Sequence, residues 1–310
     1  MMLLALLVSL VPSALAGAGP WVISSGDTSF YGGAEMQRFT KLALSNGSRA
    51  DDVVDVDDGL ETFGLKAVAS YGLRDRFEIE ALVPWYRVDA NTKGPVCAAL
   101  SLNACRTTQG IGVVSARVKG LVLDELVGRP VSLAVGTEAR FGQHTAPDRE
   151  RITNLSEGTN DLGGFVSVGR SGGLAQGFWS AWAEAGGRYR FPNTELGVGA
   201  VPGAEVFGDV EVLAGAQRWW SLGPSATFLH RPTGYDVEDI LGSAALATNV
   251  DRWGALSITS LRVGGKLIVR SSERIDLVAG VLTTAWAVNN PSDVTTVSLG
   301  VSIHPGPEAL

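Results

Sequence analysis

The chain has 310 residues, a formal net charge of −7 at pH 7 and an isoelectric point near 5.1. Its acidic balance and the lack of a Lys/Arg cluster argue against nucleic-acid binding, which needs a basic face to neutralise phosphates. Charged residues make up only 18% and the mean hydropathy is +0.16, too low for a bundle of transmembrane helices and high for a soluble enzyme. A membrane barrel, in which alternate strand residues face lipid, has such an intermediate composition.

The first element is an apolar run from Leu3 to Val11. It is followed by Ser13-Ala14-Leu15-Ala16, which places small residues at the −3 and −1 positions of a cleavage site. The run is too short to span a bilayer. We therefore expect residues 1–16 to be a signal peptide and residues 17–310 to be the exported domain, although the first residues lack the usual Lys or Arg. A buried N-terminal helix is the alternative.

Beyond that point the dominant pattern is an alternation of apolar and polar residues. Phe77, Ile79 and Val83 alternate with Glu78 and Glu80, for example, and a period of two is typical of a β-strand with one apolar face. Most of the predicted strands reach the roughly nine to eleven residues needed to cross a bilayer at a tilt. About twelve strands are predicted, at residues 28–43, 61–73, 77–89, 110–123, 129–143, 160–170, 176–191, 204–217, 219–231, 255–270, 274–287 and 293–304.

The connections between these strands alternate between short and long. Short turns are predicted at residues 74–76, 124–128, 171–175, 218 and 271–273, and longer polar stretches at 44–60, 90–109, 144–159, 192–203, 232–254 and 288–292. A soluble β-sandwich also alternates polar and apolar residues, but it has no reason to gather its short turns at one end. The sequence therefore predicts an all-β fold, an antiparallel up-and-down transmembrane β-barrel with both ends in the periplasm. Its last strand lacks the terminal aromatic residue that usually closes such barrels.

The two cysteines, Cys97 and Cys105, lie in a stretch rich in Pro, Gly and Asn at residues 91–109. In an exported protein a disulfide is the default state of such a pair. A metal or redox site would need further ligands, and no His lies nearby. We expect the bridge to order one loop, because closing so short a loop restricts few unfolded conformations.

A strand–turn–strand hairpin carries a resemblance to a known family. It reads Tyr71-Gly72-Leu73-Arg74-Asp75-Arg76-Phe77-Glu78-Ile79 and runs into Val83-Pro84-Trp85. This hairpin resembles one in the family labelled "MetA-pathway of phenol degradation", a set of outer-membrane transporters. Residues 30–35, 110–120 and 157–164 are similar to further parts of that family, in the same order. The resemblance implies a barrel that passes small, often hydrophobic or aromatic compounds, and it supplies no catalytic or binding residues.

If the apolar strand faces meet lipid, the charged faces line the interior. Both signs occur on neighbouring strands, which allows either a polar pore for dipolar or weakly charged solutes or a sealed interior of ion pairs. A pore for acidic sugars would carry an excess of Arg and Lys, and this face is balanced. The predicted lumen-lining residues are Lys66, Glu78, Glu80, Arg117, Lys119, Glu138, Arg140, Glu184, Arg188, Arg190, Asp209, Glu211, Arg262, Lys266 and Arg270.

No cofactor, metal site or catalytic residue is predicted. The acidic run at residues 51–61 has carboxylates at alternate positions, but Gly59 stands where an EF-hand needs its third carboxylate, so a solvated external loop is the preferred interpretation. Bridging of divalent ions to lipopolysaccharide stays open for this loop. The histidines His144, His230 and His304 lack the His-x-Ser arrangement of a barrel phospholipase, and no Gly-x-Ser-x-Gly elbow occurs.

These observations predict a channel or transporter for small solutes in the outer membrane of a Gram-negative bacterium. The alternatives are a closed barrel that serves as a structural or adhesive surface protein, and a lipid-active barrel enzyme. The expected partners are outer-membrane lipid and lipopolysaccharide, the barrel-assembly machinery and a small-molecule solute. The predicted loops at residues 90–109, 144–159 and 232–254 are the candidates for a constriction at the mouth.

Overall fold

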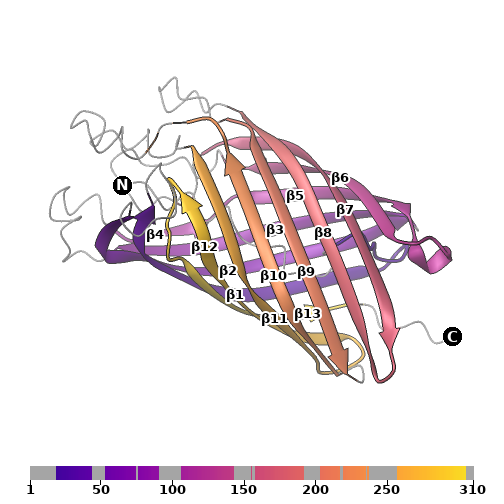
Figure 1. Cartoon of the computed structure of the whole chain (residues 1–310). Helices are drawn as coiled ribbons and strands as arrows, with labels where there is room; N and C mark the ends of the chain where they lie inside the picture. Colours follow the sequence, from indigo (N-terminus) through magenta and orange to yellow (C-terminus); the bar gives the residue numbers. More distant parts are fainter. Residues whose placement is uncertain are drawn as a thin grey trace.

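The computed structural model describes residues 19–43, 53–74, 76–90, 106–142, 155, 158–191, 203–216, 219–234, 236 and 257–304. Within them the chain forms one tilted barrel of long strands (Figure 1). The predicted signal peptide at residues 1–16, the pair Cys97 and Cys105, and most of the predicted long loops lie outside the described residues.

In the described part of the chain, the barrel wall has thirteen strands, and a short 3-10 helix lies in one of the turns. The strands are β1 (Thr28–Ala43), β2 (Val53–Arg74), β3 (Phe77–Ala90), β4 (Thr108–Ile111), β5 (Val114–Leu123), β6 (Ser132–Phe141), β7 (Asn160–Leu174), β8 (Gly177–Phe191), β9 (Glu205–Ala216), β10 (Trp220–Arg231), β11 (Ile258–Arg270), β12 (Ile275–Val288) and β13 (Thr295–Ile303). The 3-10 helix η2 spans Glu125–Val127.

The wall is closed and antiparallel throughout. Except at β4 and β5, each strand pairs with its neighbours in chain order, and β1 pairs with β13 through a register that sets Phe30 opposite Ile303. Because β4 and β5 both pair with β3, they fill one position in the wall, which therefore has twelve positions. The predicted up-and-down barrel of about twelve strands is confirmed.

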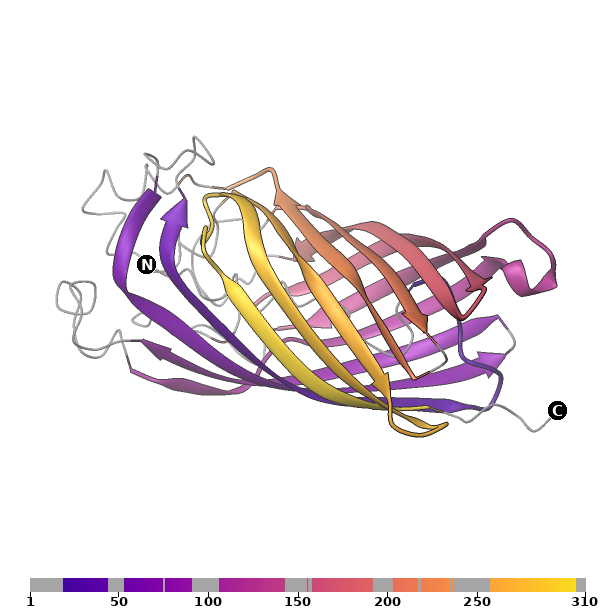
Figure 2. The ribbon, with the colours of Figure 1, turned by 60° about the horizontal axis from the view of Figure 1, so that its bottom comes forward.

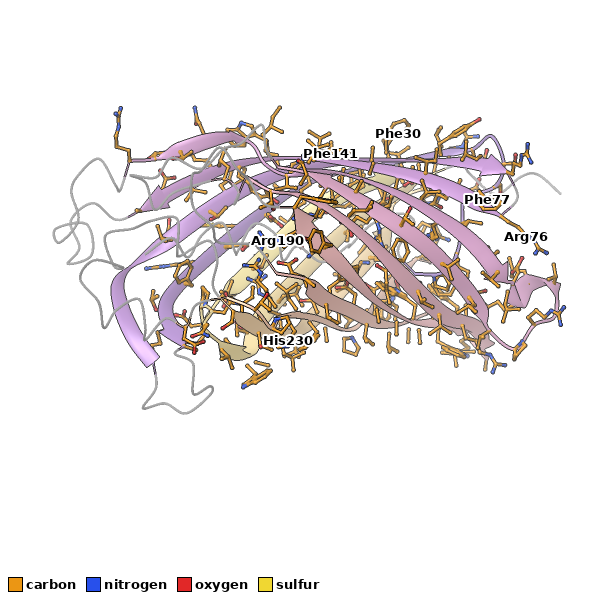
Figure 3. The ribbon with its side chains drawn as sticks, turned by 90° about the horizontal axis from the view of Figure 1, so that it is seen from above. Phe30, Arg76, Phe77, Phe141, Arg190 and His230 are labelled. Carbon is orange, nitrogen blue, oxygen red and sulfur yellow. The ribbon has the colours of Figure 1, made fainter. Side chains whose placement is uncertain are left out.

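The outer face of the wall is apolar and the inner face is polar. In β3, Phe77, Ile79 and Val83 are 50, 38 and 44% exposed, whereas Glu78 and Tyr86 on the opposite face are 2 and 1% exposed. In Figure 3, Phe30 projects outward from the wall while Arg190 lies within its outline. A band of exposed apolar side chains is the surface that lipid tails contact in a transmembrane barrel.

The strand ends joined by short connections lie at one end of the barrel, and the strand ends that lead into the long connections lie at the other, because successive strands run in opposite directions. The short connections are residues 75–76, 124–131, 175–176, 217–219 and 271–274, and we call their end the inner end. Two of these connections differ from the predicted turns. The turn predicted at residues 171–175 is shorter, because β7 continues to Leu174, which pairs with Gly177 of β8. The turn predicted at residues 124–128 extends to residue 131 and contains η2. No helix in the described part of the chain is long and apolar enough to cross a membrane.

The predicted strand at residues 110–123 is interrupted. It forms β4 and β5, separated at Gly112, because its neighbour β3 carries Pro84, which has no N–H to donate to the ladder. Gly112 N donates to the Pro84 carbonyl at 2.9 Å, so the backbone bulges there and the pairing resumes below it.

The predicted loop at residues 44–60 is wrong over its second half, because β2 begins at Val53 and pairs with the end of β1. The register shifts between Phe39 and Lys41. Asp293 secures this irregular part of β1 by accepting hydrogen bonds from Thr40 N at 2.9 Å and Lys41 N at 2.8 Å. The backbone of most of the acidic run at residues 51–61 therefore forms part of β2. The side chains of this run before Leu60 are not among those that the structure describes.

Candidate functional site

The predicted lumen-lining residues lie on the inward strand faces, with one exception. Arg270 is the last residue of β11, its side chain is 44% exposed, and it pairs with Asp276 at 3.3 Å. The strand ends there, so Arg270 lies at the inner rim rather than in the lumen. Of the others, Glu80, Arg117, Glu138 and Asp209 are half-buried, and the buried ones are Lys66, Glu78, Lys119, Arg140, Glu184, Arg188, Arg190, Glu211, Arg262 and Lys266.

Four further buried charges line the described part of the interior and were missed from the sequence. They are Glu35, Asp161, Glu205 and Arg231, which are 4, 5, 1 and 1% exposed. Glu35 could have been found from the sequence, because it lies four residues after Tyr31 in a strand and therefore on the same face. The other three stand at strand ends, where it is hard to judge which face of the wall a side chain takes. With them the described lumen carries equal numbers of basic and acidic side chains.

Four arginines and three carboxylates form a closed network on the wall from β6 to β10. Glu205 accepts from Arg188 Nε at 2.6 Å and Arg231 Nε at 3.1 Å, and its Oε1 lies 3.6 Å from Arg190 Nη1. Asp161 lies 3.3 Å from Arg140 Nη1 and 3.8 Å from Arg190 Nε. We call this set, which Glu138 completes, the arginine network.

The ring of contacts closes through Glu138, which lies 3.7 Å from Arg188 Nη1 and 4.0 Å from Arg140 Nε. Glu205 is the first residue of β9, Arg231 is the last of β10, and Arg190 is the next to last of β8. The network therefore lies toward the outer end of the lumen, where the long connections begin. All four of its cations are guanidinium groups, which bind carboxylates with two parallel donors.

The chain segment before β1 crosses the lumen at the inner end. Lys119 Nζ donates to the Gly19 and Trp21 carbonyls at 3.1 and 2.6 Å, and Ile23 N donates to Glu78 Oε2 at 2.9 Å. Gly19 and Pro20 are buried, against Trp182 of β8 and Gly169 of β7. Residues 19–25 thus contact several sides of the wall, and we call them the inner plug (indigo in Figure 2).

Glu125 fastens the inner plug to the turns at the inner end. Its Oε1 accepts from Trp21 Nε1 at 3.1 Å, and its carboxylate also accepts from Ser171 N and Oγ. The turn holds Glu125 in place because Asp124 caps η2 at its start and Gly128, at φ 86°, ends it in a conformation that favours glycine. Partial burial would raise the pKa of Glu125, but hydrogen bonds from Ser171 and Trp21 hold it below its ordinary value.

The lowered pKa predicts when this contact is lost. A carboxylate with a depressed pKa in the folded state keeps its stabilising contact above its ordinary pKa and loses it only as the pH falls through the folded value. We expect Trp21 fluorescence, taken as the difference between the wild type and Trp21→Phe, to stay constant down to the ordinary glutamate value of 4.5 and to change below it. Glu125→Gln should abolish that step, and a step near neutral pH would contradict the assignment.

Trp182, which contacts the inner plug, also lines an internal cavity. The cavity has a volume of about 50 Å³. That is enough for a few water molecules, each of which needs roughly 10–15 Å³ of such volume. Its wall contains two aromatic rings and two lysine–carboxylate pairs, from Tyr31, Trp182, Lys66, Glu35, Lys266 and Glu211. The Tyr31 ring fits because Gly33 and Gly300 beside it carry no side chain, and a Cβ there would lie 2.3–2.4 Å from the Tyr31 hydroxyl.

Two of the three candidate histidines, His230 and His304, lie among the described residues. His230 Nδ1 lies 2.9 Å from Thr259 Oγ1, and His304 Nε2 lies 3.2 Å from Asp276. His144 lies outside the described residues. In the described part of the chain no three His, Cys, Asp or Glu side chains are placed to hold a metal ion. That the chain is not an enzyme stays a prediction.

No family model and no curated protein matches the chain, so the resemblance to the phenol-degradation family stays a prediction. Among solved structures, the COG4313 outer membrane channel from Pseudomonas putida F1 is similar with a TM-score of 0.67 and 12% identity, over 92% of this chain and 97% of that one. The KdgM porin gives 0.43 and 8%, over 89 and 98%. The translocator domain of autotransporter NalP from Neisseria meningitidis gives 0.43 and 9%, over 90 and 88%. The first of these likenesses shows a shared fold, and the other two scores are too low to carry an argument.

Proposed function

We propose that this protein is an outer-membrane channel for small solutes whose lumen is closed at its inner end by the inner plug. The observation that carries this proposal is that residues 19–25 contact strands on several sides of the inner end and are held there by hydrogen bonds to Lys119 and Glu78. A segment bound in this way can leave without breaking the wall, whereas a sealed structural barrel needs only side chains to fill it.

The lumen favours polar and charged solutes. Its inner face carries paired basic and acidic side chains, and the cavity that two of these pairs line is small. The resemblance noted above implies hydrophobic or aromatic compounds, and Tyr31 and Trp182 offer aromatic surface in the cavity for the apolar part of such a solute. Small molecules that combine a polar group with a compact apolar body fit both indications.

Location and partners follow from the same proposal. The apolar outer band supports contact with outer-membrane lipid and, at the outer end, lipopolysaccharide. Export through the signal peptide at residues 1–16 and insertion by the barrel-assembly machinery of a Gram-negative bacterium complete the proposal.

A conductance measurement tests the function. The mature chain, refolded and added to a planar lipid bilayer, should give discrete steps of current in potassium chloride. A complete lack of steps, together with no solute flux into vesicles, would instead favour the closed structural barrel, for which the dense arginine network is the supporting observation. Turnover of the bilayer phospholipid would revive the enzyme alternative.

A further inference from the structure

We propose that the arginine network is a recognition site for small organic carboxylates, in which Glu205 holds the place that the carboxylate of a solute takes. The inference rests on the proposed channel function, because it names the class of solute that the channel would select. It concerns the outer end of the lumen, away from the inner plug.

The structure already contains a carboxylate in the bound position. Three guanidinium groups surround Glu205: Arg188 contacts one of its oxygens, and Arg190 and Arg231 contact the other. All four of these side chains are at least nine-tenths buried, with Glu205 and Arg231 at 1% exposure. The desolvation cost of the arginines is therefore already met in the folded protein, and the donors are directed before any solute arrives.

The basic and acidic side chains of the described lumen are equal in number, but they are not evenly distributed along its length. The arginine network sets four guanidinium groups against three carboxylates near the outer end. Deeper in the lumen, the lysines Lys66 and Lys266 each pair with a carboxylate, and Asp209 adds a further acidic group beside them. Among the described residues, a solute that enters from the outer end meets the cationic surplus of the arginine network before the lysine–carboxylate pairs. The low-dielectric walls of the lumen strengthen the electric field of that surplus.

Exchange of one carboxylate for another leaves no arginine without a partner. A solute carboxylate can take over contacts as the flexible Glu205 side chain moves aside, whereas a neutral amide brings no charge to match the guanidinium groups. The ring of Phe207 lies 4.9 Å from the Arg188 guanidinium and provides apolar surface for the body of an organic acid. A simple halide would gain nothing from that surface.

Replacement of Glu205 by alanine gives a direct test, because the atoms removed correspond to acetate. Glu205→Ala should have a lower unfolding temperature than the wild type, and millimolar acetate should raise it, whereas acetamide should not. Glu211→Ala is the matched control: Glu211 is also buried and paired, but with Lys266 and Trp182 rather than with three arginines, so acetate should stabilise it far less. If Glu205→Ala does not fold alone, its refolding yield should rise in millimolar acetate and stay unchanged in acetamide.

Current measurements give an independent readout. In a gradient of potassium acetate, the reversal potential of the wild type should show acetate permeating in preference to potassium. Arg190→Lys keeps the charge but loses the planar fork, so it should reduce the preference for acetate over chloride severalfold. Equal effects of acetate and acetamide on Glu205→Ala, or a wild-type channel that prefers potassium, would overturn the inference. Stabilisation by acetate without any conductance would keep the site and reject the channel.

Discussion

Deletion of residues 19–23 should turn a channel that is closed most of the time into one that conducts steadily. The deletion removes the backbone groups that Lys119 and Glu78 hold at the inner end, together with the Trp21 side chain that binds Glu125. It leaves the expected processing site after Ala16 and all strands in place. We expect long-lived open steps in planar bilayers, with a mean current severalfold above that of the wild type.

Two variants separate opening from general damage. Trp21→Ala loses one contact of the inner plug and should give an intermediate fraction of open time. Arg270→Gln changes an exposed charge at the same end without touching the inner plug, and it should behave like the wild type. If the deletion leaves the current unchanged, the inner plug is not the gate, and the closure lies elsewhere in the lumen.

Leu299→Arg should destabilise the barrel by about 2–4 kcal/mol, the cost of placing an arginine on the lipid-facing side near the bilayer midplane. Leu299 is the central residue of β13, and its side chain is 63% exposed toward the outside. Its neighbours across the strands, Ala34 and Ala279, offer no partner for a charge. Unfolding by guanidinium in lipid vesicles measures the loss.

Leu126→Arg is the matched control. Leu126 is even more exposed, at 83%, but it lies in η2 among the turns at the inner end. A charge there reaches water, so the free energy of unfolding should change by only a few tenths of a kcal/mol. Equal losses for the two variants would mean that the outer face of β13 does not meet lipid.

Strand number and strand facing were predictable because both depend on local alternation. The side chains of Phe77 to Tyr86 take the faces that the sequence assigns, and the inward charges Glu184, Arg188 and Arg190 in β8 do as well. In a strand with one buried face, every second side chain has the same environment, so the polarity of each residue indicates the face of the wall on which it lies.

The parts that escaped prediction depend on residues far apart in the chain. The inner plug has no strand pattern, and its anchors Lys119 and Glu125 lie about a hundred positions away. The break at Gly112 comes from Pro84 on the neighbouring strand. Glu205 and Arg231 stand at strand ends, where alternation stops, and their partnership appears only when β9 and β10 lie side by side.

The pairing of the first strand with the last has a consequence for how the barrel is made. Ser29 Oγ donates to the Ile303 carbonyl across 274 positions of the chain, at the seam between β1 and β13. Until β13 arrives, the edge of β1 presents unpaired N–H and C=O groups that lipid cannot satisfy. Closure of so distant a seam is the slow step expected for assembly. The inner plug precedes β1. With the predicted cleavage after Ala16, it would lie next to a chain end and could enter the finished barrel after the seam has closed.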